Sequence, residues 1–273
     1  MTANYQLLFT KYYRPTSLMP LSLTPLAGIP LIRHGDHLAD ILIEALPANE
    51  LTLEDDDILV IAQKIVSKAE GRAVSLAGVT PSPRAVELAQ KSEKDSRLVE
   101  LILRESKEIL RMRPGTIIVE HRLGFVCANA GIDHSNVAGP GDAGQDWVLL
   151  LPTDPDRSAE ALRQEIETRT GRRLGILIID SHGRAWRNGT VGVAIGLSGL
   201  PGLQDLRGQP DLFGFNLRIT QVGVADELAA AASLMMGQAA EGTPVVHARG
   251  FPYPLRKGSL QELLRPKEQD LFR

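Results

Sequence analysis

With 273 residues, 43% of them hydrophobic and 23% charged, the chain has the composition of a globular protein of one large domain or two smaller ones. Its 30 basic and 33 acidic residues give a net charge of −3, which argues against a general nucleic-acid-binding protein because such proteins are usually basic. No segment resembles a membrane span or a secretory signal, and the single Cys127 excludes an internal disulfide, so we expect a cytoplasmic protein with Cys127 in its core.

The apolar pattern predicts strands and helices in mixed order after an N-terminal extension at residues 1–20. Short apolar runs predict strands at residues 21–26, 57–62, 116–120, 124–128, 147–151, 174–179, 191–197 and 244–248. Helical spacing predicts helices at residues 36–46 with Asp36 as the N-cap, 84–110 with a break, 158–170 and 225–237. We expect residues 63–70 to continue the strand before them and residues 255–273 to form a charged tail.

The mixed order of elements has no strict β-α-β rhythm and contains no internal repeat. It therefore predicts the α+β class, with mixed sheets and packed helices in two interleaved lobes over residues 21–254. The segment Gly139–Gly144 matches GxGxxG, but a polar loop precedes it and a strand follows, so we do not interpret it as a dinucleotide site. The chain also lacks GxxxxGK[ST], HExxH and GxSxG motifs.

The strongest local signal follows the apolar run at residues 174–179, where Asp180, Ser181 and Arg184 surround Gly183. Strand ends of this kind are common ligand sites in sheets flanked by helices. Asp180 and Ser181 offer hard oxygen ligands that suit Mg²⁺ or Mn²⁺, and Arg184 suits a phosphate or a carboxylate. A strand-ending turn with a capping aspartate would give the same pattern.

Three further segments place polar or small residues beside predicted strands. Asp133 can supply a second metal-binding carboxylate, and Asn136 in the same loop can donate a hydrogen bond to a phosphate or a base. Lys68 follows a buried strand and can neutralise phosphate charge. Small residues around Gln238, in the segment 236–243, let the backbone approach a ligand. Each segment also fits an ordinary surface loop.

Several short motifs occur in a fixed order along the chain. The most specific are G-I-D-H-S-N-V at 131–137 and D-S-H-G-R at 180–184. The others are P-L-I at 30–32, S-K-A-E-G at 67–71, W-R at 186–187, V-A-I-G at 193–196, V-A-D-E at 224–227 and M-G at 236–237. As an ordered set, these motifs resemble the coenzyme F420-0:gamma-glutamyl ligase family from about Leu21 to Gly250.

The resemblance implies a GTP-dependent ligase that adds L-glutamate to coenzyme F420-0 through an acyl phosphate, with further gamma-linked additions left open. It also implies two Mg²⁺ or Mn²⁺ ions, K⁺ as an activator, a homodimer and a gamma-glutamyl ligase-like fold. The resemblance and the local chemistry together suggest Lys68, Asp180 and Arg184 as catalytic residues. By position, Asp133 and Asp180 would hold one metal ion, and Ser181 and Gln238 the second. The implied GTP site consists of Ile29, Pro30, Leu31, Ile32, Gln63, Lys64, Lys68, Asn136, Met236, Gly237, Gln238, Ala239, Ala240, Glu241, Gly242 and Thr243.

The chain departs from the family pattern at three places. Ser181 stands where members often carry Thr, and Gln238 stands where a Glu can occur. The segment Gly139–Gly144 looks like an extra loop near Asp133. Ser181 keeps the hydroxyl group, whereas a neutral Gln238 would weaken the second metal site.

Three other interpretations stay open at the level of sequence. The first is the same chemistry on another carboxylate acceptor, and the second is a non-catalytic nucleotide- or metabolite-binding protein. The third is a metal-dependent phosphohydrolase, which would release phosphate from GTP without an acceptor. Intact Asp133, Asp180 and Lys68 argue against the non-catalytic interpretation. We expect the acidic turn Glu54–Asp57 only to solvate a loop.

Overall fold

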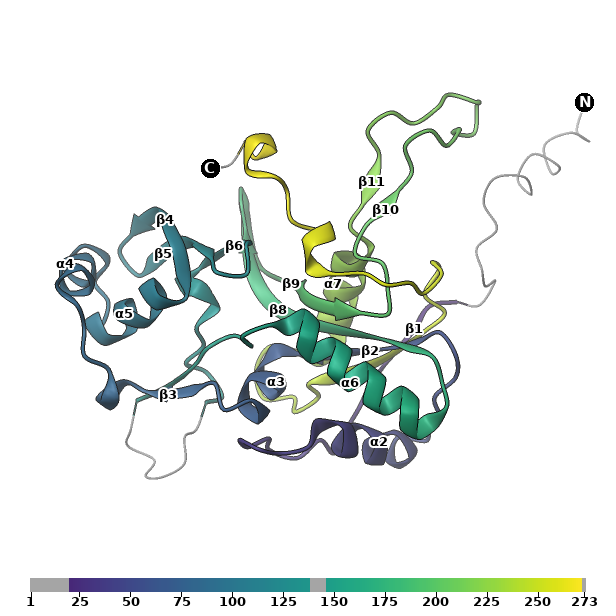
Figure 1. Ribbon diagram of the computed structural model, residues 1–273, viewed down its shortest axis with the longest axis horizontal. Coiled ribbons are helices and arrows are strands. Elements are labelled where there is room, and N and C mark those ends of the chain that lie inside the picture. Colours follow the sequence, from purple (N-terminus) through teal and green to yellow (C-terminus); the bar gives the residue numbers. More distant parts are fainter. Residues whose placement is uncertain (1–19, 138–145, 272–273) are drawn as a thin grey trace, which may run out of the picture.

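The computed structural model describes residues 20–137 and 146–271. Its main sheet has five strands in the order β1-β12-β2-β8-β9 (Figure 1). These strands are β1 (Ser22–Pro25), β12 (Val245–Arg249), β2 (Asp57–Ala62), β8 (Leu174–Arg184) and β9 (Arg187–Ser198). β2 and β8 run parallel, whereas the other neighbouring strands run antiparallel. The expectations for residues 1–19 and for the Gly139–Gly144 loop lie outside the described residues.

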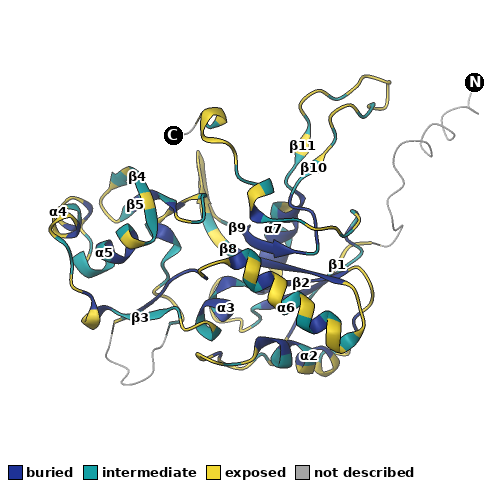
Figure 2. Cartoon of the chain, viewed as in Figure 1, coloured by how far each residue is buried: buried dark blue, intermediate teal, exposed yellow. Residues whose placement is uncertain are grey.

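Helices cover both faces of the main sheet (Figures 1 and 2). One face packs against α2 (Leu38–Ala48), α3 (Gln63–Ala69) and α6 (Pro155–Thr170), and the other against α7 (Val224–Met236). Alternation along β8 sends Ile176 and Ile178 into the first core, and Leu177 and Ile179 into the second. The interior strands read as continuous apolar runs because both of their faces are buried.

A second unit, residues 73–149, lies beside the main sheet and is called the inserted unit below (Figure 1). Its elements are β3 (Ala73–Ser75), η1 (Leu76–Gly78), α4 (Pro83–Ser92), α5 (Ser96–Arg104), β4 (Ser106–Arg113), β5 (Thr116–His121), β6 (Val126–Ala128), η2 (Asn129–Gly131) and β7 (Trp147–Leu149). The antiparallel sheet β4-β5-β6 packs on α4 and α5 around its own apolar core. Cys127 is buried in that core, as predicted. β3 pairs with β7 and connects the inserted unit to the main sheet.

The rest of the described chain extends from the main sheet. β10 (Gln204–Asp205) and β11 (Gln221–Val222) form the base of a long hairpin that projects away from the body (Figure 1). The C-terminal segment contains η3 (Leu260–Glu262) and η4 (Lys267–Gln269). Among the described helices, none has the length and apolar character needed to cross a lipid bilayer.

The α+β class is confirmed, but several predicted boundaries were wrong. Residues 63–69 form helix α3 rather than a strand, because Ile65, Val66 and Ala69 recur at helical spacing on the core side. The segment 106–110, predicted as helix, belongs to β4. α6 begins at Pro155, because Asp154 caps it through the N–H of Arg157.

The start of α2 and the tail also differ from the sequence predictions. α2 begins after His37, because the carboxylate of Asp36 accepts a hydrogen bond from the N–H of Arg33 instead of capping the helix. In the region predicted as a charged tail, Leu260 is buried and its N–H donates to Asp156. Part of this segment therefore packs on the main sheet and its helices.

Near its middle, strand β9 carries one extra residue relative to β8. Ile178 pairs with Gly196 and Ile179 with Ala194, so Ile195 has no partner in β8. This bulge reverses the face that each later residue occupies. As a result, Gly192 lies against α7, and Gly196 lies against Pro155 at the start of α6. Helices on opposite faces approach β9 closely because these two positions have no side chain.

Replacing Gly196 with Ala is expected to lower the free energy of unfolding by roughly 1–3 kcal/mol. A Cβ at this position would come within 2.4 Å of the Pro155 Cβ and 2.5 Å of its carbonyl carbon, so the start of α6 must move. Gly78→Ala is the control, because a Cβ there meets nothing within 4 Å. Urea unfolding of the two variants compares them, and equal midpoints would contradict this account of the packing.

Candidate functional site

Most of the polar residues selected in the sequence analysis lie at the carboxyl ends of β2 and β8, a region called the strand-end site below. The last pair between these strands is Ala62 with Ile179. Beyond it β2 turns directly into α3, which carries Gln63, Lys64 and Lys68, while β8 continues into Asp180. Neighbouring parallel strands end at the same edge of a sheet, and such edges are the usual ligand sites of sheets flanked by helices.

Asp133 reaches the strand-end site from the inserted unit. Its backbone exchanges hydrogen bonds of 3.0 and 2.9 Å with Leu149. Its side chain accepts a hydrogen bond of 2.7 Å from Gln63 Nε2, and Lys64 Nζ lies 3.5 Å away. Gln63 is buried and is oriented by Ser67, whose Oγ donates to Gln63 Oε1 at 2.9 Å. Two neighbouring side chains of α3 therefore contact the Asp133 carboxylate, both at its Oδ2 atom.

Asp133 and Asp180 lie close enough to affect each other's charge. Burial raises the pKa of the Asp133 carboxyl to about 6, the negative charge of Asp180 contributes to the rise, and Lys64 and Gln63 oppose it. Two crowded carboxylates with hard oxygen atoms fit a divalent cation. Among the described residues, no group of three or more His, Cys, Asp or Glu side chains is placed to hold a metal ion. The donor set resembles the usual Mg²⁺ arrangement, in which one or two carboxylates act together with water and substrate phosphates.

Asp180 also contacts a histidine that the sequence analysis did not select. β8 continues beyond residue 179, where the strand was predicted to end, through Asp180 to Arg184 and pairs there with β9, so the turn lies after Arg184. Residues two apart on a strand share a face, and His182 Nε2 lies 3.0 Å from Asp180 Oδ2. Phe125 packs against the His182 ring. The D-S-H spacing places Asp180 and His182 two residues apart. It would have predicted their contact only if the strand had been expected to continue past Asp180.

Ser181 points to the opposite face of β8, toward the end of α7. Its Oγ donates to Gln238 Oε1 at 2.8 Å, and Gln238 Nε2 donates to Ser233 Oγ at 3.0 Å. The four predicted metal ligands therefore form two separate pairs, Asp133 with Asp180 and Ser181 with Gln238.

Two loops that the resemblance assigns to GTP meet near the strand-end site. Asn136 Nδ2 donates to the carbonyl oxygen of Ala239 at 3.0 Å. Within the second loop, Glu241 accepts a hydrogen bond from the N–H of Ala239, and Thr243 Oγ1 donates to the carbonyl oxygen of Met236. Of the remaining residues of this loop, Gly237 has a positive φ of 72°, while Ala240 and Gly242 are exposed.

The loop at residues 29–32 is followed by a contact with the end of α3. The N–H of Gly35 donates to the carbonyl oxygen of Ala69 at 3.0 Å, which fixes the loop next to the helix that carries Lys64 and Lys68. Ile32 is buried, and Ile29 packs against the core. Pro30 and Leu31 are exposed, and Leu31 has 88% of its surface accessible.

Lys68 and Arg184, both selected as catalytic, have different surroundings. Lys68 is half-buried, and its pKa is lowered by burial and by Lys64, while the charge of Asp133 opposes the shift. Arg184 lies four residues after Asp180 on an extended strand, about 13 Å along the chain. Its Nη2 donates to the carbonyl oxygen of Asn188. The structure therefore brings Lys68 to the strand-end site but leaves Arg184 at the exposed end of the β8-β9 hairpin.

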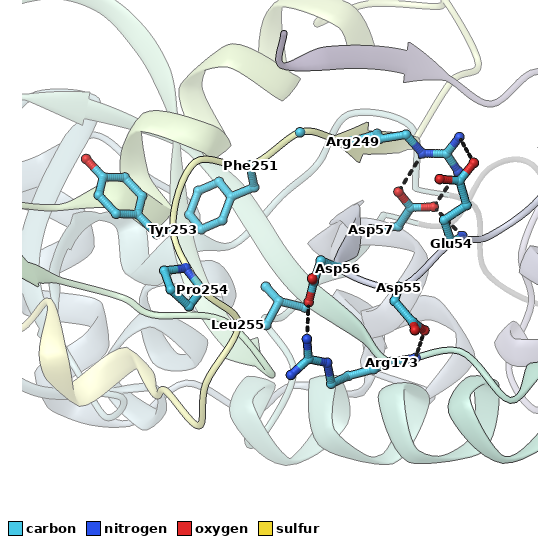
Figure 3. Close-up of a pocket in the computed structure, with 11 residues that line it drawn as sticks. Glu54, Asp55, Asp56, Asp57, Arg173, Arg249, Phe251, Tyr253, Pro254 and Leu255 are labelled. Carbon is cyan, nitrogen blue, oxygen red and sulfur yellow. Dashed lines mark hydrogen bonds and ion pairs between the residues drawn. The ribbon is translucent and has the colours of Figure 1, made fainter. Parts of the chain in front are cut away.

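A cavity of about 240 Å³ lies at the opposite end of the sheet, where β2 begins (Figure 3). Asp57 lines it and is 1% exposed; Arg249 donates to both of its carboxylate oxygens at 2.8 and 2.7 Å. His247 Nε2 lies 2.8 Å from Asp57, and Arg173 pairs with Asp56. Burial alone would raise the pKa of Asp57, but the contacts with Arg249 and His247 lower it to about 2. The expectation that the turn Glu54–Asp57 only solvates a loop is wrong for Asp57.

The comparisons with known proteins agree on one family. A family model described as F420-0:Gamma-glutamyl ligase matches residues 28–250. A coenzyme F420:L-glutamate ligase of Methanothermobacter thermautotrophicus is 50% identical over 257 residues, covering 93% of this chain and 100% of that protein. Proteins of the same name from Methanocaldococcus jannaschii and Archaeoglobus fulgidus are 48% and 42% identical. These alignments cover 81% and 93% of this chain, and 86% and 97% of the relatives.

Replacing Asp57 with Asn is expected to lower the free energy of unfolding by roughly 3 kcal/mol at neutral pH, because Arg249 and His247 lose a buried carboxylate. The folded pKa of Asp57 is about 2, below its ordinary value of 3.8, so its contribution is present above 3.8 and is lost as the pH falls through 2. Urea unfolding should therefore show that variant and wild type converge in acid.

The matched control for this prediction is Asp56→Asn. Asp56 pairs with Arg173 at an exposed position, and such surface pairs contribute about 1 kcal/mol or less. If Asp57→Asn and Asp56→Asn unfolded at the same urea concentration at neutral pH, the buried ion pair would have no special role in stability.

Proposed function

The chain belongs to the F420-0:gamma-glutamyl ligase family, and on this basis we propose that it joins L-glutamate to coenzyme F420-0 in a reaction driven by GTP. The observation that carries the proposal is the convergence of Asp133 and Asp180, with Gln63, Lys64 and Lys68, at the carboxyl ends of β2 and β8. Family membership indicates amide-bond formation. The strand-end site supports the use of a phosphorylated cosubstrate, because it combines carboxylates suited to a cation with two lysines.

Amide formation from a carboxylate needs activation, because the carboxylate oxygen is a poor leaving group. In the proposed reaction the acceptor carboxylate takes the γ-phosphoryl group of GTP, and GDP leaves. The amine of L-glutamate then attacks the acyl carbon, the amide bond forms, and phosphate leaves while the nitrogen loses a proton. The protein contributes mainly position and charge neutralisation in such a reaction.

The residues of the strand-end site divide these tasks. Asp133 and Asp180 would hold a Mg²⁺ or Mn²⁺ ion, which would neutralise phosphate charge when bound. Ser181 and Gln238 would hold a second ion on the other face of β8, and K⁺ is a further proposed activator. Gln63 and Ser67 fix the Asp133 carboxylate, and Lys64 and Lys68 supply positive charge near the transferring group.

We assign the guanine nucleotide to the space bounded by the loop at 29–32, α3, Asn136 and the loop at 236–243. The Asn136–Ala239 hydrogen bond and the Gly35–Ala69 hydrogen bond support this assignment, because they hold three separate chain segments around α3. The proposed setting is the cytoplasm, in keeping with a single, buried and unpaired Cys127.

Replacing Asp180 with Asn is expected to lower turnover at least about 100-fold while the fold stays intact, since the amide removes one metal-binding charge. The assay contains GTP, Mg²⁺ or Mn²⁺, L-glutamate and coenzyme F420-0, and follows the product by mass. Asp40→Asn, at an exposed position on α2, is the matched control and should keep full turnover. Near-normal turnover in a folded Asp180→Asn variant would remove Asp180 from the site.

The same assay separates the ligase from its two catalytic alternatives. A GTP-dependent gain of one or more glutamyl residues is the expected result. GTP binding with no gain on coenzyme F420-0 would indicate a ligase for another carboxylate acceptor. Phosphate release from GTP without glutamate and acceptor would indicate a phosphohydrolase.

A further inference from the structure

His182 lies in the strand-end site, and the proposed reaction gives it no task. It follows Asp180 by two positions on β8, so the two side chains share a face of the strand. Its Nε2 atom lies 3.0 Å from Asp180 Oδ2, and the two side chains are only 12% and 11% exposed, so water competes weakly for the contact. A carboxylate that binds a cation is ionised and only accepts hydrogen bonds, so the imidazole Nε2–H is the donor.

The imidazole ring of His182 is held by the inserted unit. Phe125 packs against it, with the ring centres 5.3 Å apart and the ring planes at 53°. Phe125 also stacks on the ring of His121, at 5.2 Å between centres and 8° between planes. His121 is buried, and its Nδ1 accepts a hydrogen bond of 3.0 Å from the N–H of Leu123. A row of rings therefore runs from the turn between β5 and β6 to β8, and Figure 1 shows β6 beside β8.

Phe125 is itself fixed at the junction of two apolar cores. Its side chain packs against the core between the main sheet and α2, α3 and α6, and also against the core of the inserted unit. Its carbonyl oxygen accepts a hydrogen bond of 2.8 Å from the N–H of His121, which closes the turn. Because closely packed side chains keep their rotamers, the ring of His182 has little freedom to leave Asp180.

The two carboxylates of the strand-end site are held in the same way. Gln63 Nε2 donates to Asp133 Oδ2 at 2.7 Å, and His182 Nε2 donates to Asp180 Oδ2 at 3.0 Å. The negative charges of Asp133 and Asp180 repel each other, and the terminal torsion of an aspartate side chain turns easily. Without its donor, either carboxylate would be free to turn away from the other.

We propose that His182 is a positioning residue, which fixes the carboxylate of Asp180 in the orientation that binds the divalent cation. This inference rests on the proposed function, in which Asp180 is a metal ligand. His182 acts through its hydrogen bond to Asp180 and does not touch the reacting atoms. Removing a donor that orients a metal-binding side chain commonly lowers metal affinity by about 10- to 100-fold.

The test is the affinity of the metal-free full chain for Mn²⁺, measured from the electron paramagnetic resonance signal of the free ion. His182→Leu should raise the Mn²⁺ dissociation constant about 10-fold or more, because the donor is lost. His182→Gln should stay within about threefold of the wild type, because its amide N–H stands the same number of bonds from Cβ as the imidazole Nε2. His182→Asn, whose shorter amide loses the same contact, takes the place of the leucine variant if that variant does not fold.

The matched control is His37→Leu. His37 Nδ1 lies 3.0 Å from Asp40 Oδ2 in an exposed pair at the start of α2, so this variant removes a histidine–aspartate contact of the same length outside the site. It should bind Mn²⁺ like the wild type. In the glutamate-addition assay, excess Mn²⁺ should recover the turnover of His182→Leu, with the KM for L-glutamate unchanged. A residue that only packs would cause a loss that excess Mn²⁺ does not restore.

The outcomes separate this inference from the proposed function. Weakened Mn²⁺ binding by Asp180→Asn together with unchanged binding by His182→Leu would overturn the positioning role alone, as would equal losses in the leucine and glutamine variants. Unchanged Mn²⁺ binding by Asp180→Asn, or no binding by the wild type, would overturn the metal assignment and the positioning role with it. If the Mn²⁺ affinities follow the expected order but no glutamate is added to coenzyme F420-0, the positioning role stands and the proposed reaction fails.

Discussion

The parallel pairing of β2 with β8 is the constraint on which the candidate site depends. The pairing runs in register from Asp57 with Leu174 to Ala62 with Ile179. Two parallel strands cannot be joined by a tight turn, so the chain between them must make a long crossing. In this protein that crossing, residues 63–173, contains α3, the inserted unit and α6. The same pairing places the start of α3 and Asp180 at one edge of the sheet.

The inserted unit completes that edge by bringing back Asp133. β3 follows α3 closely and pairs with β7, and Asp133 bridges to Leu149 at the end of β7. The chain that leaves the inserted unit at Asp133 therefore lies next to Gln63 and Lys64. Asp133 stands 47 residues before Asp180 in the sequence. The pairing of β3 with β7 nevertheless holds it close enough for the charge of Asp180 to raise its pKa.

Buried carboxylates lie near both ends of β2, but their charges are balanced to different degrees. At the start of the strand, Asp57 is paired with Arg249 and has a low pKa, so its negative charge stabilises the fold. At the other end, burial and Asp180 raise the pKa of Asp133, and its partners only partly offset this. A group whose charge is incompletely balanced is more typical of a ligand site than of a structural ion pair.

The fold class, the family and most residues of the candidate site could be predicted from the sequence alone. Apolar periodicity identified the strands of the main sheet and the α+β class, since both depend on local spacing. The ordered motifs around Asp133 and Asp180 indicated the family, and the polar residues next to strand ends indicated most of the strand-end site. These features are carried by neighbouring residues and need no knowledge of distant contacts.

Only the tertiary structure decided the remaining features. Whether residues 63–69 form helix or strand, and how far β8 extends, depends on pairing with β9 and packing on the core. That extension gives Asp180 its contact with His182 and leaves Arg184 at an exposed tip. Asp57 could not be distinguished from its acidic neighbours, because its partner Arg249 is 192 residues away. Long-range contacts of this kind leave no local pattern, since each partner alone looks like an ordinary polar residue.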